Sequence, residues 1–79
     1  MNVYIIDDHA LFRNGLISLL ESRKINAQSA ATAKEGLIQI EKFRFDIILL
    51  DLRMPEMSGI EVLRLIKSKN IKFTFCFVL

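Results

Sequence analysis

Three aspartates follow two strongly apolar stretches of this sequence, and carboxylates placed in this way can bind a metal ion. Asp7 and Asp8 come directly after residues 3–6 (VYII), and Asp51 comes directly after residues 47–50 (IILL). Short continuous apolar runs of this kind predict strands that are buried on both faces. Ligands of open parallel sheets bind beyond the carboxyl ends of the strands, so neighbouring strands would bring these three carboxylates together.

The charges of the three carboxylates point to a cation. Like charges a few ångströms apart repel one another, and a small hard cation relieves that repulsion. Mg²⁺ prefers oxygen ligands and often combines one or two carboxylates with a phosphoryl oxygen. A lone Asp after a strand is more often a helix cap or turn former, and the pair Asp7-Asp8 alone is as often merely solvated. Acids at the same end of two buried strands favour a binding pocket.

The rest of the chain alternates between helical and strand patterns. Helical spacing of apolar residues predicts a helix over residues 10–23, with Arg13 on its polar side. Residues 25–31 alternate weakly and predict a thin edge strand. The apolar positions of the predicted helix are Phe12, Leu16, Leu19 and Leu20.

Two capping boxes predict where two further helices begin. In Thr32-x-x-Glu35 and Ser58-x-x-Glu61, a hydroxyl and a carboxylate can satisfy free backbone N–H groups. Residues 73–79 (FTFCFVL) predict a final strand. The order is β-α-β-α-β-α-β, which predicts the α/β class and a parallel sheet with right-handed crossovers. The inward positions of the two helices are Ala33, Leu37 and Ile40, then Leu63 and Ile66.

Length and composition exclude several classes of protein. The 79 residues allow one small domain, and 52% apolar residues indicate a folded chain. A net charge of +2 without a basic run does not indicate nucleic-acid binding. The single cysteine, Cys76, cannot form an internal disulfide, and no signal peptide or membrane span is predicted. A cytoplasmic protein is therefore expected.

The acid pair Asp7-Asp8 and the segment Asp51-Leu-Arg-Met-Pro-x-x-x-Gly59 together resemble the receiver domains of bacterial response regulators. The resemblance covers residues 2–72 and implies a flavodoxin-like, doubly wound parallel sheet like that of CheY. The stretch IIDDHALFRNGL is closer still to receivers that precede LuxR-type helix-turn-helix output domains. Met54-Pro55 and Gly59 resemble the turn that holds the loop after the acceptor.

The resemblance also implies a role for each residue of the motif. Asp51 would be the phospho-acceptor of a two-component phosphorelay, supplied by a histidine kinase or a phosphotransfer protein. Asp8 would bind Mg²⁺ directly, Asp7 directly or through water, Asp51 itself would join them, and Arg53 would contribute its backbone carbonyl. Such a domain assists its own phosphorylation and is not an enzyme. It would control transcription through an output domain and would not bind nucleic acid itself.

The chain departs from the family in its extent. A receiver has five strand-helix units, and here three are followed by a fourth strand, so we expect the N-terminal part of a receiver (residues 1–79) without an output domain. The Ser or Thr and the Lys that grip the phosphate in the family would fall after Leu79. Residues 73–79 would then form an uncharged edge strand, able to pair with a partner or a second copy.

Two alternatives remain beside the receiver interpretation. The chain could be a non-switching fragment that pairs through residues 73–79. It could also be a phosphatase with an aspartyl-phosphate intermediate, although haloacid-dehalogenase-like enzymes carry Asp-x-Asp where this chain has Asp7-Asp8-His9. His9 is expected to be a hydrogen-bonding residue at a helix start and not a metal ligand or phosphodonor.

Overall fold

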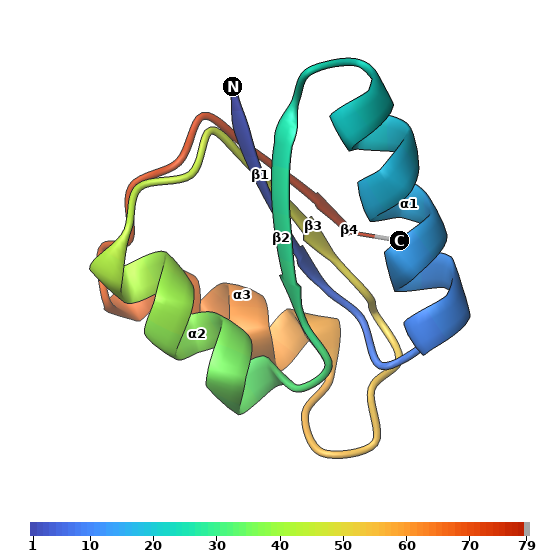
Figure 1. The fold of residues 1–79 in the computed structure, drawn as a ribbon. Helices are drawn as coiled ribbons and strands as arrows, with labels where there is room; N and C mark the ends of the chain where they lie inside the picture. The colour runs from blue at the N-terminus through green and yellow to red at the C-terminus, as the bar shows by residue number, and fades with distance from the viewer. Residues whose placement is uncertain (79) are drawn as a thin grey trace.

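The structure, a computed structural model, describes residues 1–78 and contains one parallel sheet with helices on both faces (Figure 1). The sheet order is β2-β1-β3-β4, and every neighbouring pair is parallel. This confirms the predicted α/β class and the flavodoxin-like strand order. The elements are β1 (Asn2–Ile6), α1 (Ala10–Ser22), β2 (Asn26–Ala30), α2 (Ala33–Lys42), β3 (Ile47–Leu50), α3 (Gly59–Ser68) and β4 (Phe75–Val78).

The main core lies between the sheet and the helices α2 and α3, on one side of the sheet in Figure 1. Alternate residues of β1 and β3 point to this side because side chains of a strand alternate between the two faces. Tyr4 packs edge-on against Phe45, with ring centroids 4.9 Å apart. None of the helices in residues 1–78 is long and apolar enough to cross a bilayer. The strand residues of this core are Tyr4, Ile6, Ala30, Ile48 and Leu50.

Both predicted capping residues begin their helices. The Thr32 hydroxyl accepts a hydrogen bond from the Glu35 N–H at 3.2 Å, and the Ser58 hydroxyl accepts one from the Glu61 N–H at 3.3 Å. Each bond satisfies one of the backbone donors that a helix start leaves free. The predicted inward residues of α2 are buried; in α3, Ile66 is buried and Leu63 is half-buried against the core.

The predicted helix is confirmed as α1, but its apolar positions are not buried. The helix ends at Ser22, and none of its residues is buried: Phe12 is 49% exposed and Leu19 is 55% exposed. The reason is positional. Within residues 1–78, α1 is the only helix on its side of the sheet and lies against the edge strand β2 (Figure 1), so little surrounds its apolar residues.

The last strand is shorter than predicted. Only Phe75–Val78 pair with β3, in register Ile47↔Phe75 to Leu50↔Val78. Residues 73 and 74 precede the strand, and residue 79 of the predicted segment lies outside the described residues. Cys76 packs against the main core, so Phe75 and Phe77 point to the other side of the sheet, where α1 lies.

Gly36 is needed for packing, which the sequence pattern did not reveal. It is buried in α2, and a Cβ atom there would lie 2.6 Å from Ile6 Cδ1 and 2.7 Å from Ile6 Cγ1. Ile6 is fully buried among other core side chains, so moving its side chain would disturb its neighbours. The absence of a side chain at position 36 therefore lets α2 pack closely on β1.

We expect Gly36→Ala to lower the free energy of unfolding by about 1–2 kcal/mol, because overpacking costs more than the helix propensity gained. Urea unfolding followed by circular dichroism measures this change. Gly15→Ala is the matched control, since nothing lies within 4 Å of a Cβ at that helical glycine. The control should stabilise by up to about 1 kcal/mol. Equal stabilisation by both changes would contradict the packing argument.

Candidate functional site

The pairing of β1 with β3 brings Asp7 and Asp51 to the same edge of the sheet. Ile6 is in register with Leu50. Asp7 directly follows Ile6, and Asp51 directly follows Leu50. The Asp51 N–H donates to the Ile6 carbonyl at 2.9 Å, and the Asp7 N–H donates to the Ala30 carbonyl at 3.2 Å. Backbone hydrogen bonds to two neighbouring strands therefore hold both aspartates in place.

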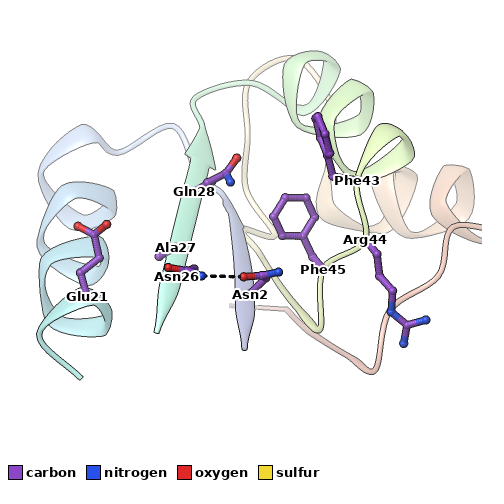
Figure 2. Close-up of a pocket in the computed structure, with 8 residues that line it drawn as sticks. All are labelled: Asn2, Glu21, Asn26, Ala27, Gln28, Phe43, Arg44 and Phe45. Atoms are coloured by element: carbon purple, nitrogen blue, oxygen red, sulfur yellow. Dashed lines mark hydrogen bonds between the residues drawn. The ribbon is translucent and has the colours of Figure 1, made fainter. Parts of the chain in front are cut away.

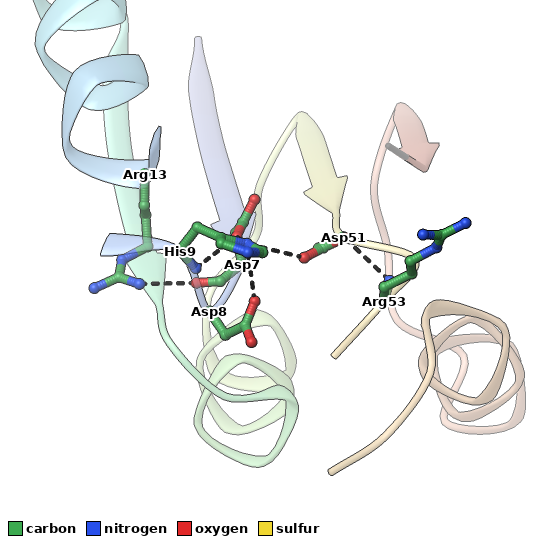
Figure 3. A network of polar contacts seen from close by, with 6 residues as sticks. All are labelled: Asp7, Asp8, His9, Arg13, Asp51 and Arg53. Carbon is green, nitrogen blue, oxygen red and sulfur yellow. Dashed lines mark hydrogen bonds and ion pairs between the residues drawn. The ribbon is translucent and has the colours of Figure 1, made fainter. Parts of the chain in front are cut away.

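Local turns orient the carboxylates of Asp7 and Asp51 (Figure 3). Asp7, whose side chain is only 6% exposed, accepts the His9 N–H on Oδ1 at 2.8 Å. Asp51, with a 14% exposed side chain, accepts the Arg53 N–H on Oδ1 at 3.0 Å. Such bonds from a residue two positions later are typical of Asp in turns. The guanidinium of Arg53 points away from the acids in Figure 3.

His9 lies among all three carboxylates. Its Nδ1 atom is 3.1 Å from Asp7 Oδ1, 3.1 Å from Asp8 Oδ1 and 3.7 Å from Asp51 Oδ2. A ring nitrogen carries at most one hydrogen, and the hydrogen-bond geometry is met at Asp7. Asp8 Oδ1 and Asp51 Oδ2 are therefore close to a nitrogen and yet are buried without a hydrogen-bond partner.

The three acids change the protonation of His9. The hydrogen bond to Asp7 raises the pKa of the imidazole above its usual 6.5, and the charge of Asp8 adds to this effect. Opposite charges nearby favour the charged form of a histidine. When the ring is protonated, it is thus a partial counter-ion for the carboxylates.

The arrangement fits a divalent metal ion. One ligand atom from each of Asp7, Asp8, His9 and Asp51 lies within 4.8 Å of all the others. Oxygen ligands about 2.1 Å from Mg²⁺ are separated by up to about 4.2 Å, so a small contraction would close the shell. An ion here would also satisfy the two buried oxygens that lack hydrogen-bond partners.

Arg13 is a site residue that the sequence pattern did not reveal. It was expected on the polar side of the first helix, but its Nη1 atom donates to the Asp7 carbonyl oxygen at 2.8 Å (Figure 3). Its own N–H also donates to the His9 carbonyl at 2.9 Å. Arg13 thereby ties the first turn of α1 to the acid pair. The sequence signal that could have identified Arg13 as a site residue is its position one helical turn after Asp7-Asp8-His9.

A model of the response regulator receiver domain family matches residues 3–78 of the chain. The chain belongs to this family. Relatives support the assignment: it is 43% identical over 75 residues to the protein-glutamate methylesterase/protein-glutamine glutaminase of Treponema denticola and 35% identical over 72 residues to the cell cycle response regulator CtrA of Brucella ovis. Each match covers 91% of this chain but only 20% and 31% of those two proteins.

Solved receiver structures have the same fold. The chemotaxis protein CheY4 of Vibrio cholerae superposes with a TM-score of 0.90 at 29% identity, over 98% of this chain and 65% of CheY4. The Francisella response regulator 1452 receiver domain gives 0.89 at 27% identity, over 98% of this chain and 63% of that one. This receiver therefore shares the sheet and helices described above with receivers of two-component systems.

The loop after Asp51 in this receiver contacts the start of α3. The Gly59 N–H donates to the Leu52 carbonyl at 3.0 Å. A Cβ at position 59 would lie 2.9 Å from Leu52 Cα and 3.0 Å from the Asp51 carbonyl oxygen. These are backbone atoms, which cannot rotate away as a side chain can. Gly59 therefore allows a close approach between the two segments.

A large hollow of the receiver is remote from the acids. It has a volume of about 440 Å³ and lies at the amino ends of β1 and β2, where Asn26 Nδ2 donates to Asn2 Oδ1 at 3.1 Å (Figure 2). Its charged groups are single and do not converge in Figure 2, so we assign no chemistry to it. A smaller hollow of about 170 Å³ adjoins Asp8 and the Met54-Pro55 loop. The large one is lined by Asn2, Glu21, Asn26, Ala27, Gln28, Phe43, Arg44 and Phe45.

In metal-free protein, we expect the pKa of His9 to lie above 6.5 and to fall in Asp7→Asn, which removes the principal cause of the shift. His9 is the only histidine, so its ring proton is unambiguous in an NMR titration. Because the folded-state pKa is raised, the associated stabilisation is present below pH 6.5 and is lost as pH rises through the folded-state pKa. Glu21→Gln, remote from the acids, is the control. A midpoint insensitive to Asp7→Asn would refute the assigned cause.

Proposed function

We propose that Asp51 accepts a phosphoryl group from the phosphohistidine of a histidine kinase or phosphotransfer protein. Mg²⁺ would be held by Asp7, Asp8, Asp51 and the backbone carbonyl of Arg53. The observation that carries this proposal is the register of β1 and β3, which places Asp51 beside the acid pair with one buried oxygen free of hydrogen bonds.

The chemistry needs little from the protein beyond placement. A carboxylate oxygen of Asp51 attacks phosphorus, the bond from phosphorus to the imidazole nitrogen of the donor breaks, and its electron pair stays on that nitrogen. The carboxylate is already ionised and needs no general base. Bound Mg²⁺ would supply compensation for the charge on the phosphoryl oxygens. The Arg53 N–H holds one carboxylate oxygen and thereby orients the other.

The cellular role proposed here follows the family. We place this receiver in the cytoplasm, upstream of an output domain of the LuxR helix-turn-helix type that controls transcription. The sequence IIDDHALFRNGL supports that subgroup. The chain spans 20% of the length of the methylesterase relative, so that catalytic name describes the longer protein, and we propose no substrate turnover for this domain. Family membership likewise weakens the phosphatase alternative.

We expect incubation with Mg²⁺ and acetyl phosphate to add the mass of one phosphoryl group, seen by intact-mass spectrometry. Asp51→Asn should abolish the adduct, because the amide is not a nucleophile of comparable strength. Glu56→Gln, which removes an exposed acid from the same loop, should leave it unchanged. An adduct that persists in Asp51→Asn, or no adduct in the native protein, would refute the acceptor role.

We also propose, as a second function, that a second copy of the chain pairs with β4. In residues 1–78, β4 is an edge strand without charged residues, and edge strands of this kind pair readily. Phe75 and Phe77 stack with ring centroids 6.1 Å apart, yet they are 57% and 50% exposed. Their apolar surface would be covered by the partner copy.

Sedimentation velocity over a range of concentrations should show a monomer-dimer equilibrium for the native chain. Phe77→Lys should weaken it by roughly tenfold or more, about 1.4 kcal/mol, because a charge would be buried against the partner. Ile38→Lys introduces the same charge at an exposed apolar residue of α2 and should have no effect. A monomer at every concentration, or equal effects of both changes, would exclude pairing through β4.

A further inference from the structure

We propose that His9 is a fourth ligand of the acid pocket, which makes this receiver bind a borderline divalent ion such as Zn²⁺ or Co²⁺ at the position of Mg²⁺. The inference rests on the proposed function to the extent that the three carboxylates hold a metal ion. It concerns which ion they hold and does not require that Asp51 be phosphorylated.

The contacts of His9 Nδ1, which serve as a hydrogen bond and ion pairs in the metal-free protein, are also short enough for ligands that share one ion. Two ligand atoms about 2.0–2.1 Å from an ion are about 2.8–3.0 Å apart at a right angle and about 3.3–3.4 Å apart at the tetrahedral angle. The Nδ1 atom lies 3.1 Å from one oxygen of Asp7 and 3.1 Å from one of Asp8. Asp51 Oδ2 at 3.7 Å completes the group with a small movement. Figure 3 shows the ring between Asp7, Asp8 and Asp51.

Two of these oxygens lack any other partner. Asp8 Oδ1 and Asp51 Oδ2 are buried and make no hydrogen bond, although both are close to the imidazole nitrogen. Leaving a buried charged oxygen without a partner is costly, and a cation among the four atoms removes that cost. The ion would lie between the unsatisfied oxygens, and Nδ1 is within 3.7 Å of both of them.

The backbone fixes His9 beside the acids, while its ring can adjust. The His9 N–H donates to Asp7 Oδ1, and its carbonyl accepts the Arg13 N–H at 2.9 Å. The side chain is 70% exposed, so the ring can rotate to complete a coordination shell without displacing the core.

The chemistry of the ligands determines which metal ions the pocket prefers. Carboxylate oxygens suit Mg²⁺ and Zn²⁺ alike, whereas imidazole nitrogen suits Zn²⁺, Co²⁺ and Ni²⁺ and is a poor ligand for Mg²⁺. Any carboxylate site already favours Zn²⁺ over Mg²⁺ to some degree. The diagnostic quantity is therefore the change in that preference when the imidazole alone is removed.

The test is isothermal titration of the metal-free protein with MgCl₂ and, separately, with ZnCl₂ at one pH. We expect His9→Asn to weaken Zn²⁺ binding about tenfold or more and to leave Mg²⁺ binding unchanged. Asp7→Asn, the control for the shared carboxylates, should weaken both ions. In Co²⁺-loaded native protein, the ring protons of the single histidine should shift far outside the diamagnetic NMR range.

The results separate this proposal from the phosphorylation proposal. Equal effects of His9→Asn on both ions, no effect on Zn²⁺, or unshifted His9 protons in the Co²⁺ protein would each overturn it. Failure of Asp51 to accept a phosphoryl group from acetyl phosphate with Mg²⁺ would overturn the proposed function alone. If the pocket bound neither Mg²⁺ nor Zn²⁺, the metal site would be refuted in both proposals.

Discussion

The parallel pairing of β1 with β3 is the constraint on which the site depends. It places Asp51 next to Asp7 because Ile6 and Leu50 are in register. A shift of one residue would turn every side chain of β3 to the opposite face and expose Ile48 and Leu50, so the apolar core fixes the register. The free energy that buries these branched side chains thereby also holds together carboxylates that would otherwise move apart.

The arrangement of the acids lowers the stability of the folded protein locally, and burial of the apolar core offsets that loss. Buried carboxylate oxygens of Asp8 and Asp51 lack hydrogen-bond partners, and such groups typically cost about 1–3 kcal/mol each. His9 compensates only in part, because one ring nitrogen cannot serve three acids. Unfavourable electrostatics of this kind are common at functional sites, where a ligand supplies what the protein lacks.

Sequence patterns predicted the features that depend on local chemistry. Apolar runs gave β1 and β3, and the hydroxyl-acid pairs at Thr32 and Ser58 gave the starts of α2 and α3. Features that depend on three-dimensional neighbours were missed. The exposure of α1 follows from what lies beside it, and the contact of Arg13 with the Asp7 carbonyl follows from how the helix is oriented. The packing of Gly36 against Ile6 likewise depends on a strand thirty residues away.

The contact at Gly59 has a mechanical consequence. A hydrogen bond joins the Gly59 N–H to the Leu52 carbonyl, and the space a side chain would need at position 59 is taken by backbone atoms of Asp51 and Leu52. Atoms in such contact cannot absorb a displacement by rotating a side chain. The backbone after Asp51 and the first turn of α3 are therefore coupled directly, without a side chain between them that could rotate. A displacement of the backbone at Asp51 or Leu52 would therefore move the start of α3 with it.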